Sequence, residues 1–120
     1  MSFVSDARIV AEALSGYLDE SVSREKPVVR QPPLGQLIAD LGLAQHVATG
    51  GLSGDSLSRF LQDYLSTTTR LHHPGCLAHQ VSVPHLAGAL GTFIDGFTNN
   101  PMAIYEMGPG AASIEYFIIN

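Results

Sequence analysis

The sequence predicts a mostly α-helical protein, and three observations support that prediction. Apolar residues recur at helical spacing near residues 5–23, 54–67 and 84–99. Clusters of proline and glycine separate these stretches, as expected of turns between helices. The composition, 45% hydrophobic and 14% charged, is that of an ordered soluble protein. With 120 residues, the chain is one small domain or part of a larger one.

The first helix is expected over residues 5–23. Ser5 can cap its amino end, and Asp6 suits the positive end of the helix dipole. One face is apolar and consists of Ile9, Val10, Ala13, Leu14, Tyr17 and Leu18. Three of the seven prolines lie in residues 24–33, which should therefore form an extended strap.

Two further helices are expected in the first half of the chain. A short one should cover residues 34–41 and end at Gly42, and the Gly50-Gly51 pair marks a turn. Ser53 should cap the next helix, at residues 54–67. Its apolar face consists of Leu57, Phe60, Leu61, Tyr64 and Leu65.

The second half begins with an irregular segment, residues 70–83, with room for a short strand. Pro84 should open a helix that runs to about Asn99. A last helix should follow Pro109, which suits a first helical position. That helix runs into an apolar stretch and stops at Asn120 without a glycine cap or polar tail, so the chain looks cut within a helix.

Charge and hydropathy exclude several classes of protein. The net charge is −5 and the six Lys and Arg residues are scattered, so a nucleic-acid interface is not expected. Residues 81–97 are too interrupted by polar side chains to be expected to cross a membrane. Residues 1–20 lack an uninterrupted apolar stretch, so no signal peptide is expected there. A single cysteine, Cys76, excludes an internal disulfide. Together these features indicate a reducing, cytoplasmic location.

The densest polar cluster lies in the irregular segment and consists of His72, His73, Cys76, His79, Gln80, Ser82 and His85. Histidine and cysteine are zinc ligands, but this spacing matches no zinc motif and lacks a second cysteine pair. Cys76 could also act as a nucleophile beside a histidine, although a lone cysteine is more often a small buried hydrophobe. Neither reading is preferred, and no metal site is predicted.

Other candidates for chemistry are weaker. Gly108-Pro109-Gly110 fits neither common phosphate-loop pattern. Asp95, Glu106 and Glu115 could serve acid–base chemistry, but the sequence does not fix their separation. These features alone indicate only a mostly helical module with one polar loop.

Three segments nevertheless resemble a known family. Residues 72–84 read HHPGCLAHQVSVP, residues 99–109 read NNPMAIYEMGP, and Ile114-Glu115 follows. Their order and spacing resemble the N-terminal portion of the group II pyridoxal-phosphate (PLP)-dependent decarboxylases, which act on glutamate, aromatic amino acids or diaminobutyrate. The likeness is good from about Leu71 to Asn120 and faint before that.

The resemblance implies an N-terminal helical segment of a fold-type I PLP enzyme, whose whole fold is α/β and which is a homodimer. This segment is not an independent catalytic domain in that family. Residues 1–70 would form helices and a strap that contact the dimer partner. Residues 71–120 would form the substrate loop and the helices that lead into the large PLP domain.

The resemblance also implies roles for individual residues. His79 and Gln80 would border the substrate, and Ser82, just before a helix start that attracts anions, would border the cofactor phosphate. Ala103, Ile104 and Tyr105 would face the substrate pocket of the opposite subunit. Ala103 looks closer to the glutamate and diaminobutyrate branches. Gln80 resembles the glutamate branch, whereas His79 departs from the asparagine usual there, so the identity of the substrate stays open.

PLP chemistry also requires a buried lysine that forms an imine with the cofactor. The only lysine is Lys26, in the strap, and it does not suit this role. We therefore expect no catalytic residue on this chain, which should be inactive alone, with PLP bound mainly by the remainder of the decarboxylase. The rival interpretation is a stand-alone, non-catalytic helical module that dimerises through its apolar faces.

Overall fold

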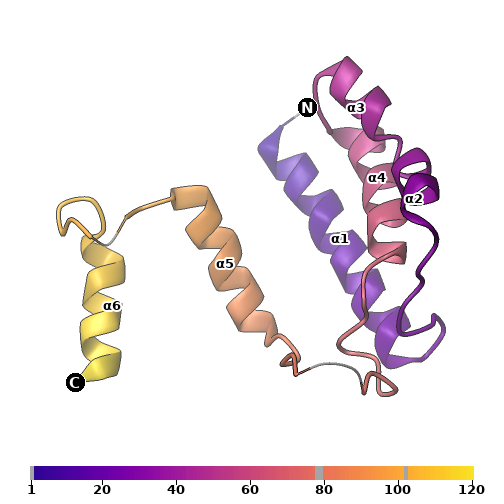
Figure 1. Ribbon diagram of the computed structural model, residues 1–120. Coiled ribbons are helices and arrows are strands. Elements are labelled where there is room, and N and C mark those ends of the chain that lie inside the picture. The colour runs from indigo at the N-terminus through magenta and orange to yellow at the C-terminus, as the bar shows by residue number, and fades with distance from the viewer. Residues whose placement is uncertain (1, 78–79, 102) are drawn as a thin grey trace. The chain divides into compact units, whose positions relative to one another are not determined.

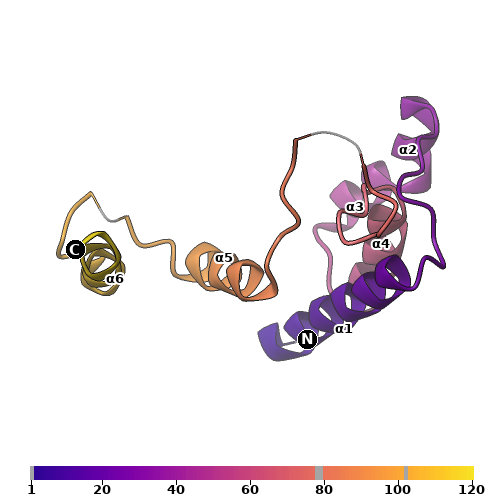
Figure 2. The ribbon, with the colours of Figure 1, turned by 90° about the horizontal axis from the view of Figure 1, so that it is seen from below.

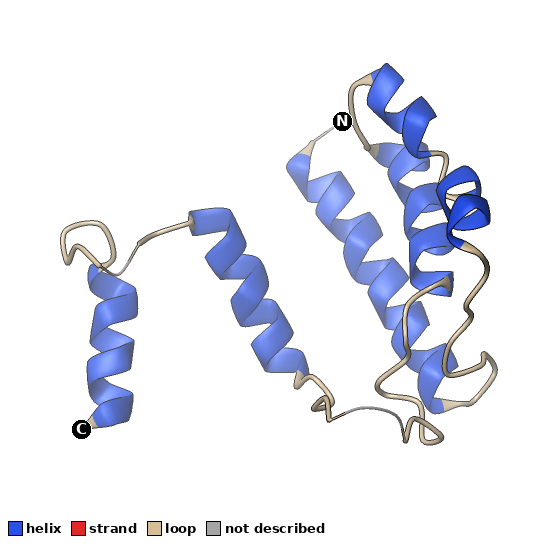
Figure 3. Ribbon diagram, viewed as in Figure 1, coloured by secondary structure: helices blue, strands red, loops and turns tan. Residues whose placement is uncertain are grey.

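The computed structural model describes residues 2–77, 80–101 and 103–120. Within them the chain is helical and contains no strand (Figure 3), which confirms the mostly α prediction and removes the short strand considered in residues 70–83. The helices of these residues are α1 (Phe3–Val22), α2 (Leu34–Asp40), α3 (Leu43–Thr49), α4 (Gly54–Ser66), α5 (Leu86–Thr98) and α6 (Pro109–Ile119).

The chain divides into two units, Met1–Val83 and Pro84–Asn120. The first holds α1 to α4 and the second holds α5 and α6. The division predicted at residues 70 and 71 concerned dimer contacts and a substrate loop, and those roles remain predictions.

Helix α1 begins at Phe3, two residues earlier than expected, because Ser2 rather than Ser5 is the N-cap. The Ser5 N–H donates to Ser2 Oγ at 3.3 Å, and Ser5 Oγ accepts from the Ser2 N–H at 3.2 Å. This reciprocal pair is a capping box, which satisfies two backbone donors at the helix start. The assignment of Ser5 as the cap was therefore wrong, although Ser5 does belong to the box.

The carboxyl end of α1 closes with an arginine in the left-handed conformation. Arg24 has φ 66°, and the Glu25 N–H donates to the Glu20 carbonyl at 3.2 Å. The Arg24 N–H donates to the Ser21 carbonyl at 3.3 Å. These two bonds form a Schellman motif, which usually has glycine at the left-handed position. The proline-rich strap then leads to α2.

Helix α3 was not predicted from the sequence. It begins after Gly42 (φ 58°) and ends at Gly50 (φ 81°), and both glycines adopt the left-handed conformation. The ring of His46 in α3 meets the ring of Phe60 in α4 edge to face, with centroids 5.5 Å apart. Gly42 thus ends one helix and starts another, where the sequence indicated only an end.

Helices α1 and α4 pack along each other in parallel (Figures 1 and 2). At their amino ends, the Gly54 N–H donates to Asp6 Oδ1 at 3.0 Å. At their carboxyl ends, the hydroxyl of Thr68, just beyond α4, lies 2.9 Å from the hydroxyl of Tyr17. The strap, α2 and α3 make the return connection that a parallel pair requires. Ser53 is the N-cap of α4, as predicted.

Apolar side chains between these helices are only half-buried. No apolar residue in the described part of the chain is fully buried, although most residues of the predicted apolar faces of α1 and α4 are half-buried. Leu14 and Tyr64 are the members of those faces that are exposed. The buried side chains of the first unit are instead polar: Ser21 is 0% and Arg70 is 5% exposed.

In the second unit, α5 begins at Leu86, two residues later than predicted. His85 is the N-cap and its Nδ1 accepts from the Ala87 N–H at 3.2 Å. The backbone of His85 is extended, so Pro84 precedes the helix rather than opening it. Asn99, with φ 46°, ends α5, and Pro109 opens α6 as expected.

Candidate functional site

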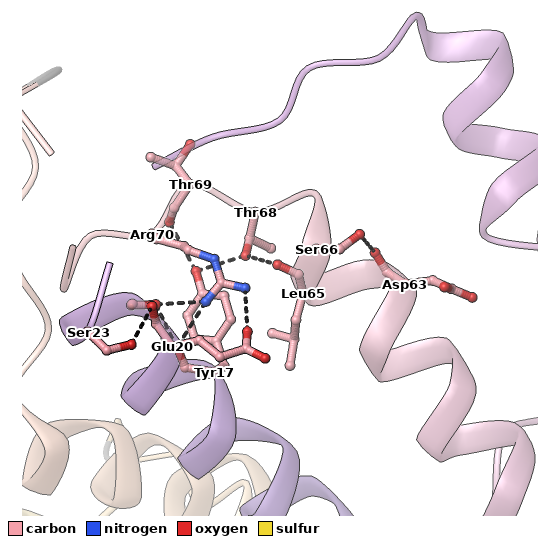
Figure 4. Close-up of polar contacts among 10 residues, drawn as sticks. Tyr17, Glu20, Ser23, Asp63, Leu65, Ser66, Thr68, Thr69 and Arg70 are labelled. Carbon is pink, nitrogen blue, oxygen red and sulfur yellow. Dashed lines mark hydrogen bonds and ion pairs between the residues drawn. The ribbon is translucent and has the colours of Figure 1, made fainter. Parts of the chain in front are cut away.

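A buried arginine joins the end of α4 to the last turns of α1 (Figure 4). Nη1 of Arg70 donates to the Tyr17 carbonyl at 3.0 Å and to Ser21 Oγ at 2.9 Å, and Nη2 donates to Glu20 Oε2 at 3.0 Å. The guanidinium carbon lies 4.2 Å from the centroid of the Tyr17 ring. We call Tyr17, Glu20, Ser21 and Arg70 the arginine anchor.

The buried polar atoms of the arginine anchor are hydrogen-bonded, and no buried side-chain nitrogen or oxygen of the described residues lacks a partner. Ser21 Oγ donates to the Tyr17 carbonyl at 2.6 Å and accepts from Arg70. The Tyr17 hydroxyl donates to the Thr69 carbonyl at 3.3 Å. Satisfied polar groups of this kind fix one arrangement of the chain rather than leaving a free ligand-binding group.

The polar loop leaves directly from the arginine anchor. The Arg70 N–H donates to the Val28 carbonyl in the strap at 2.7 Å. Two turns follow: the His73 N–H donates to the Arg70 carbonyl at 3.0 Å, and the Cys76 N–H donates to the His73 carbonyl at 2.9 Å. His73 Nδ1 also accepts from the Gly75 N–H at 2.8 Å. Hydrogen bonds therefore hold the loop from Arg70 to Cys76.

Beyond Cys76, the described residues of the loop are exposed. Leu77 is 94% exposed, and residues 80–83 are all exposed. Of the predicted substrate residues here, His79 lies outside the described residues. Gln80 and Ser82 form no hydrogen bond with another described residue, so both polar side chains are open to a ligand.

Ser82 does not stand at a helix start. Helix α5 begins at Leu86, and the histidine at position 85 already accepts from one of its first N–H groups. The expectation that Ser82 lies at an anion-attracting helix start was therefore wrong, because His85 and Pro84 keep the intervening chain extended. Its assignment to the cofactor phosphate rests on the resemblance alone.

The other predicted substrate residues belong to the second unit. Ala103, Ile104 and Tyr105 are exposed in a turn, where the Met107 N–H donates to the Ile104 carbonyl at 3.0 Å and the Gly108 N–H donates to the Tyr105 carbonyl at 3.2 Å. The turn presents Ile104 and Tyr105 outward, with 57% and 65% of their surfaces exposed.

A groove of about 580 Å³ runs between α1, α4 and the strap in the first unit. Ile9, Ala13 and Leu65 contribute apolar walls, whereas Lys26 and Arg30 contribute the charged side chains of the strap. This groove could not be predicted from the sequence, because its walls come from three separate segments.

The described residues do not fit a PLP site. A cofactor imine requires a buried lysine, but Lys26 is exposed on the strap. Within residues 2–77, 80–101 and 103–120, no three His, Cys, Asp or Glu side chains lie close enough together to bind a metal ion. Cys76 is a free, half-buried thiol.

The second unit exposes most of its apolar residues. On α5 these are Leu86, Leu90, Phe93, Ile94 and Phe97, and on α6 they are Ile114, Tyr116, Phe117, Ile118 and Ile119. Gly88, Gly91 and Gly96 add open space, since a Cβ at each would meet no atom within 4 Å. None of the described helices is both long enough and apolar enough to cross a membrane.

Comparison of the chain with models of protein families, with curated proteins and with solved structures finds no match. The structure shows a polar loop held at Arg70, with Leu77 and residues 80–83 exposed. It also shows an exposed turn at residues 103–105 and two helices, α5 and α6, with exposed apolar faces.

Proposed function

We propose that this chain is the N-terminal part of a PLP-dependent carboxy-lyase that converts an L-amino acid to an amine and carbon dioxide. One observation carries the proposal: residues 72–84, residues 99–109 and Ile114-Glu115 resemble the group II decarboxylases in residue type, order and spacing. In this role the chain supplies substrate-pocket residues and dimer contacts in amino-acid metabolism.

The exposure of the polar loop supports this role. Gln80 and Ser82 have exposed side chains without hydrogen bonds to other described residues, and a ligand can therefore use them without breaking the fold. The turn that carries Ile104 and Tyr105 is likewise exposed. A small amino-acid substrate would be bound between such groups and the remainder of the enzyme.

The exposed apolar surface of the second unit also supports the proposal that this chain packs against other parts of a larger enzyme. Burying an apolar face is worth about 25 cal/mol per Å². The exposed faces of α5 and α6 would gain that free energy against the remainder of the decarboxylase chain or the homodimer partner. We propose no nucleic-acid or membrane partner for these apolar faces.

The chain should be inactive alone. The reaction depends on a lysine that holds the cofactor, and the exposed Lys26 does not provide one. We therefore assign the cofactor lysine, and most of the PLP site, to the remainder of the enzyme.

The test compares the natural polypeptide that carries this segment with the 120-residue chain. The natural polypeptide should have a mass far above 12.8 kDa. With PLP, the natural polypeptide should release carbon dioxide from glutamate, diaminobutyrate or an aromatic amino acid. The 120-residue chain should release none, and borohydride should trap no productive PLP adduct on Lys26. Turnover by the short chain, or none by the natural polypeptide, would refute the proposal.

A stand-alone dimerisation module is the second candidate, and the exposed faces of α5 and α6 favour it. It predicts a natural polypeptide of 12.8 kDa that forms stable dimers and has no affinity for PLP. Mass and PLP titration of the same sample therefore separate the two functions.

A further inference from the structure

The arginine anchor couples a buried guanidinium to the start of the polar loop. Arg70 is 5% exposed, and its two terminal nitrogens contact the carbonyl, hydroxyl and carboxylate oxygens of three residues within the last turns of α1 (Figure 4). Its guanidinium also lies over the Tyr17 ring. Hydrogen bonds in several directions fix the rotation of the side chain as well as its position.

Lysine cannot reproduce this arrangement. An ammonium is a single point on a flexible stem, whereas a guanidinium is a planar fork whose donors point in fixed directions. A buried ion pair is weak evidence of stability, because desolvation offsets much of the attraction between the charges. The particular use of arginine at position 70 is thus to specify one geometry.

The backbone transmits that geometry to the loop. Arg70 donates its N–H to Val28 and accepts from His73 through its carbonyl, and His73 in turn accepts from Cys76. Each turn begins where the previous one ends. The course of residues 71–77 is therefore set by the orientation of Arg70.

We propose that Arg70 is a positioning residue, which holds residues 71–77, the part of the polar loop that precedes Gln80 and Ser82, in one orientation. The packing of α1 on α4 has other supports, since half-buried apolar side chains line that contact and Asp6 binds the Gly54 N–H at its far end. The effect on the loop stands by itself, whereas the effect on substrate rests on the proposed function.

The first test is hydrogen exchange in the 120-residue chain. In Arg70→Lys, the amides of His73, Gly75 and Cys76 should exchange about tenfold faster, while central amides of α1 and α4 stay within about threefold of the parent chain. Arg59→Lys is the matched control, because Arg59 is an exposed residue of α4, and it should change neither region.

Two results would overturn the proposal. One is an unchanged loop with a lower melting temperature, which would make Arg70 only a support between helices. The other is equal acceleration of the loop and both helices. If Arg70→Lys does not fold, Glu20→Gln provides the test instead. This variant removes the carboxylate charge that pairs with Nη2 of Arg70, and it should speed amide exchange in the loop about threefold without unfolding α1.

The second test uses the complete enzyme. Arg70→Lys should raise KM about fivefold and change kcat less than about twofold, because the loop binds substrate without touching the reacting bond. Arg59→Lys should leave both constants unchanged. A loosened loop with unchanged KM would refute the role in substrate positioning. Absence of decarboxylation in the unmutated enzyme would refute the proposed function instead, and the exchange result would still hold.

Discussion

Ser21 and Arg70 are the buried polar side chains of the first unit, in a part of the molecule where the apolar residues are only half-buried. The Ser21 hydroxyl both donates to the Tyr17 carbonyl and accepts from the guanidinium. Removing one partner of such a pair leaves the other unsatisfied, which costs more than the bond itself contributes. At this scale the fold is specified by hydrogen bonds rather than by a tightly packed apolar core.

Gln80 and Ser82, which are exposed in the loop, should affect activity rather than stability when they are replaced. In the complete enzyme, Gln80→Ala and Ser82→Ala should each lower kcat/KM at least about tenfold, or about 1.4 kcal/mol of transition-state stabilisation, with melting temperature unchanged. Stability should not change, because neither side chain bonds to another described residue and His85 is the cap of α5.

Ser56→Ala is the matched control for Ser82→Ala. Ser56 Oγ accepts from the Ser53 N–H at 3.2 Å, so its loss should lower stability by about 1 kcal/mol and leave kcat/KM unchanged. Thermal melts and kinetics per folded enzyme measure both effects. If Ser82→Ala instead lowers the melting temperature with full activity, its assignment to the site is wrong.

The sequence predicted the polar loop but not its anchor. Histidines, a glutamine and a serine clustered near two prolines are visible in one dimension. Arg70 and Glu20 are not, because polar residues at a helix end usually face water and their meeting depends on contacts 50 residues apart. The predicted positions of His79, Gln80, Ser82 and residues 103–105 in a substrate pocket remain predictions.

At the scale of elements, hydrophobic periodicity predicted α1, α4 and α5, and the glycine and proline signals at Gly42 and Pro109 indicated α2 and α6, but α3 was not predicted. The ends were less accurate than the helices themselves, as with Ser5 at the start of α1 and Pro84 before α5. Side chains compete for the capping position, and the sequence contains several candidates near each start. Gly42 was read only as a stop, because its left-handed conformation can also turn the chain directly into a new helix.

The end of α1 offers a test in which one substitution has opposite effects at two sites. Arg24 is left-handed, which costs an L-residue about 1 kcal/mol relative to glycine. Arg24→Gly should therefore stabilise the first unit by about that amount. Arg59→Gly, in the interior of α4, should destabilise it by about 1 kcal/mol.

Urea unfolding followed by circular dichroism would measure both changes. The two variants lose the same charge and the same side chain, so a difference in sign reports only backbone conformation. Equal destabilisation by both would mean that Arg24 contributes contacts that outweigh its strained backbone.

At the scale of the whole molecule, the second unit determines how the chain behaves in solution. Its apolar residues are mostly exposed, and this favours association with another polypeptide. We expect the pure 120-residue chain to self-associate as its concentration rises. Sedimentation velocity would detect this, and a well-folded monomer over the whole concentration range would contradict it.

Charged substitutions locate the surface responsible. Phe117 on α6 is 84% exposed, and Phe117→Asp should weaken association by about tenfold or more. Val47 on α3 is 82% exposed but belongs to the first unit, so Val47→Asp should have little effect. Equal effects of the two substitutions would indicate non-specific aggregation.

The arginine anchor also has a consequence for the order of events in folding. Glu20 and Arg70 are 50 residues apart, so their ion pair forms only after the chain has closed a loop that contains α2, α3 and α4. Closing a loop of that length costs on the order of 3 kcal/mol of chain entropy. The individual helices depend on local contacts and can form within about a microsecond. The anchor therefore belongs to the late, slow part of the folding reaction, and the polar loop acquires its orientation only when the first unit is otherwise complete.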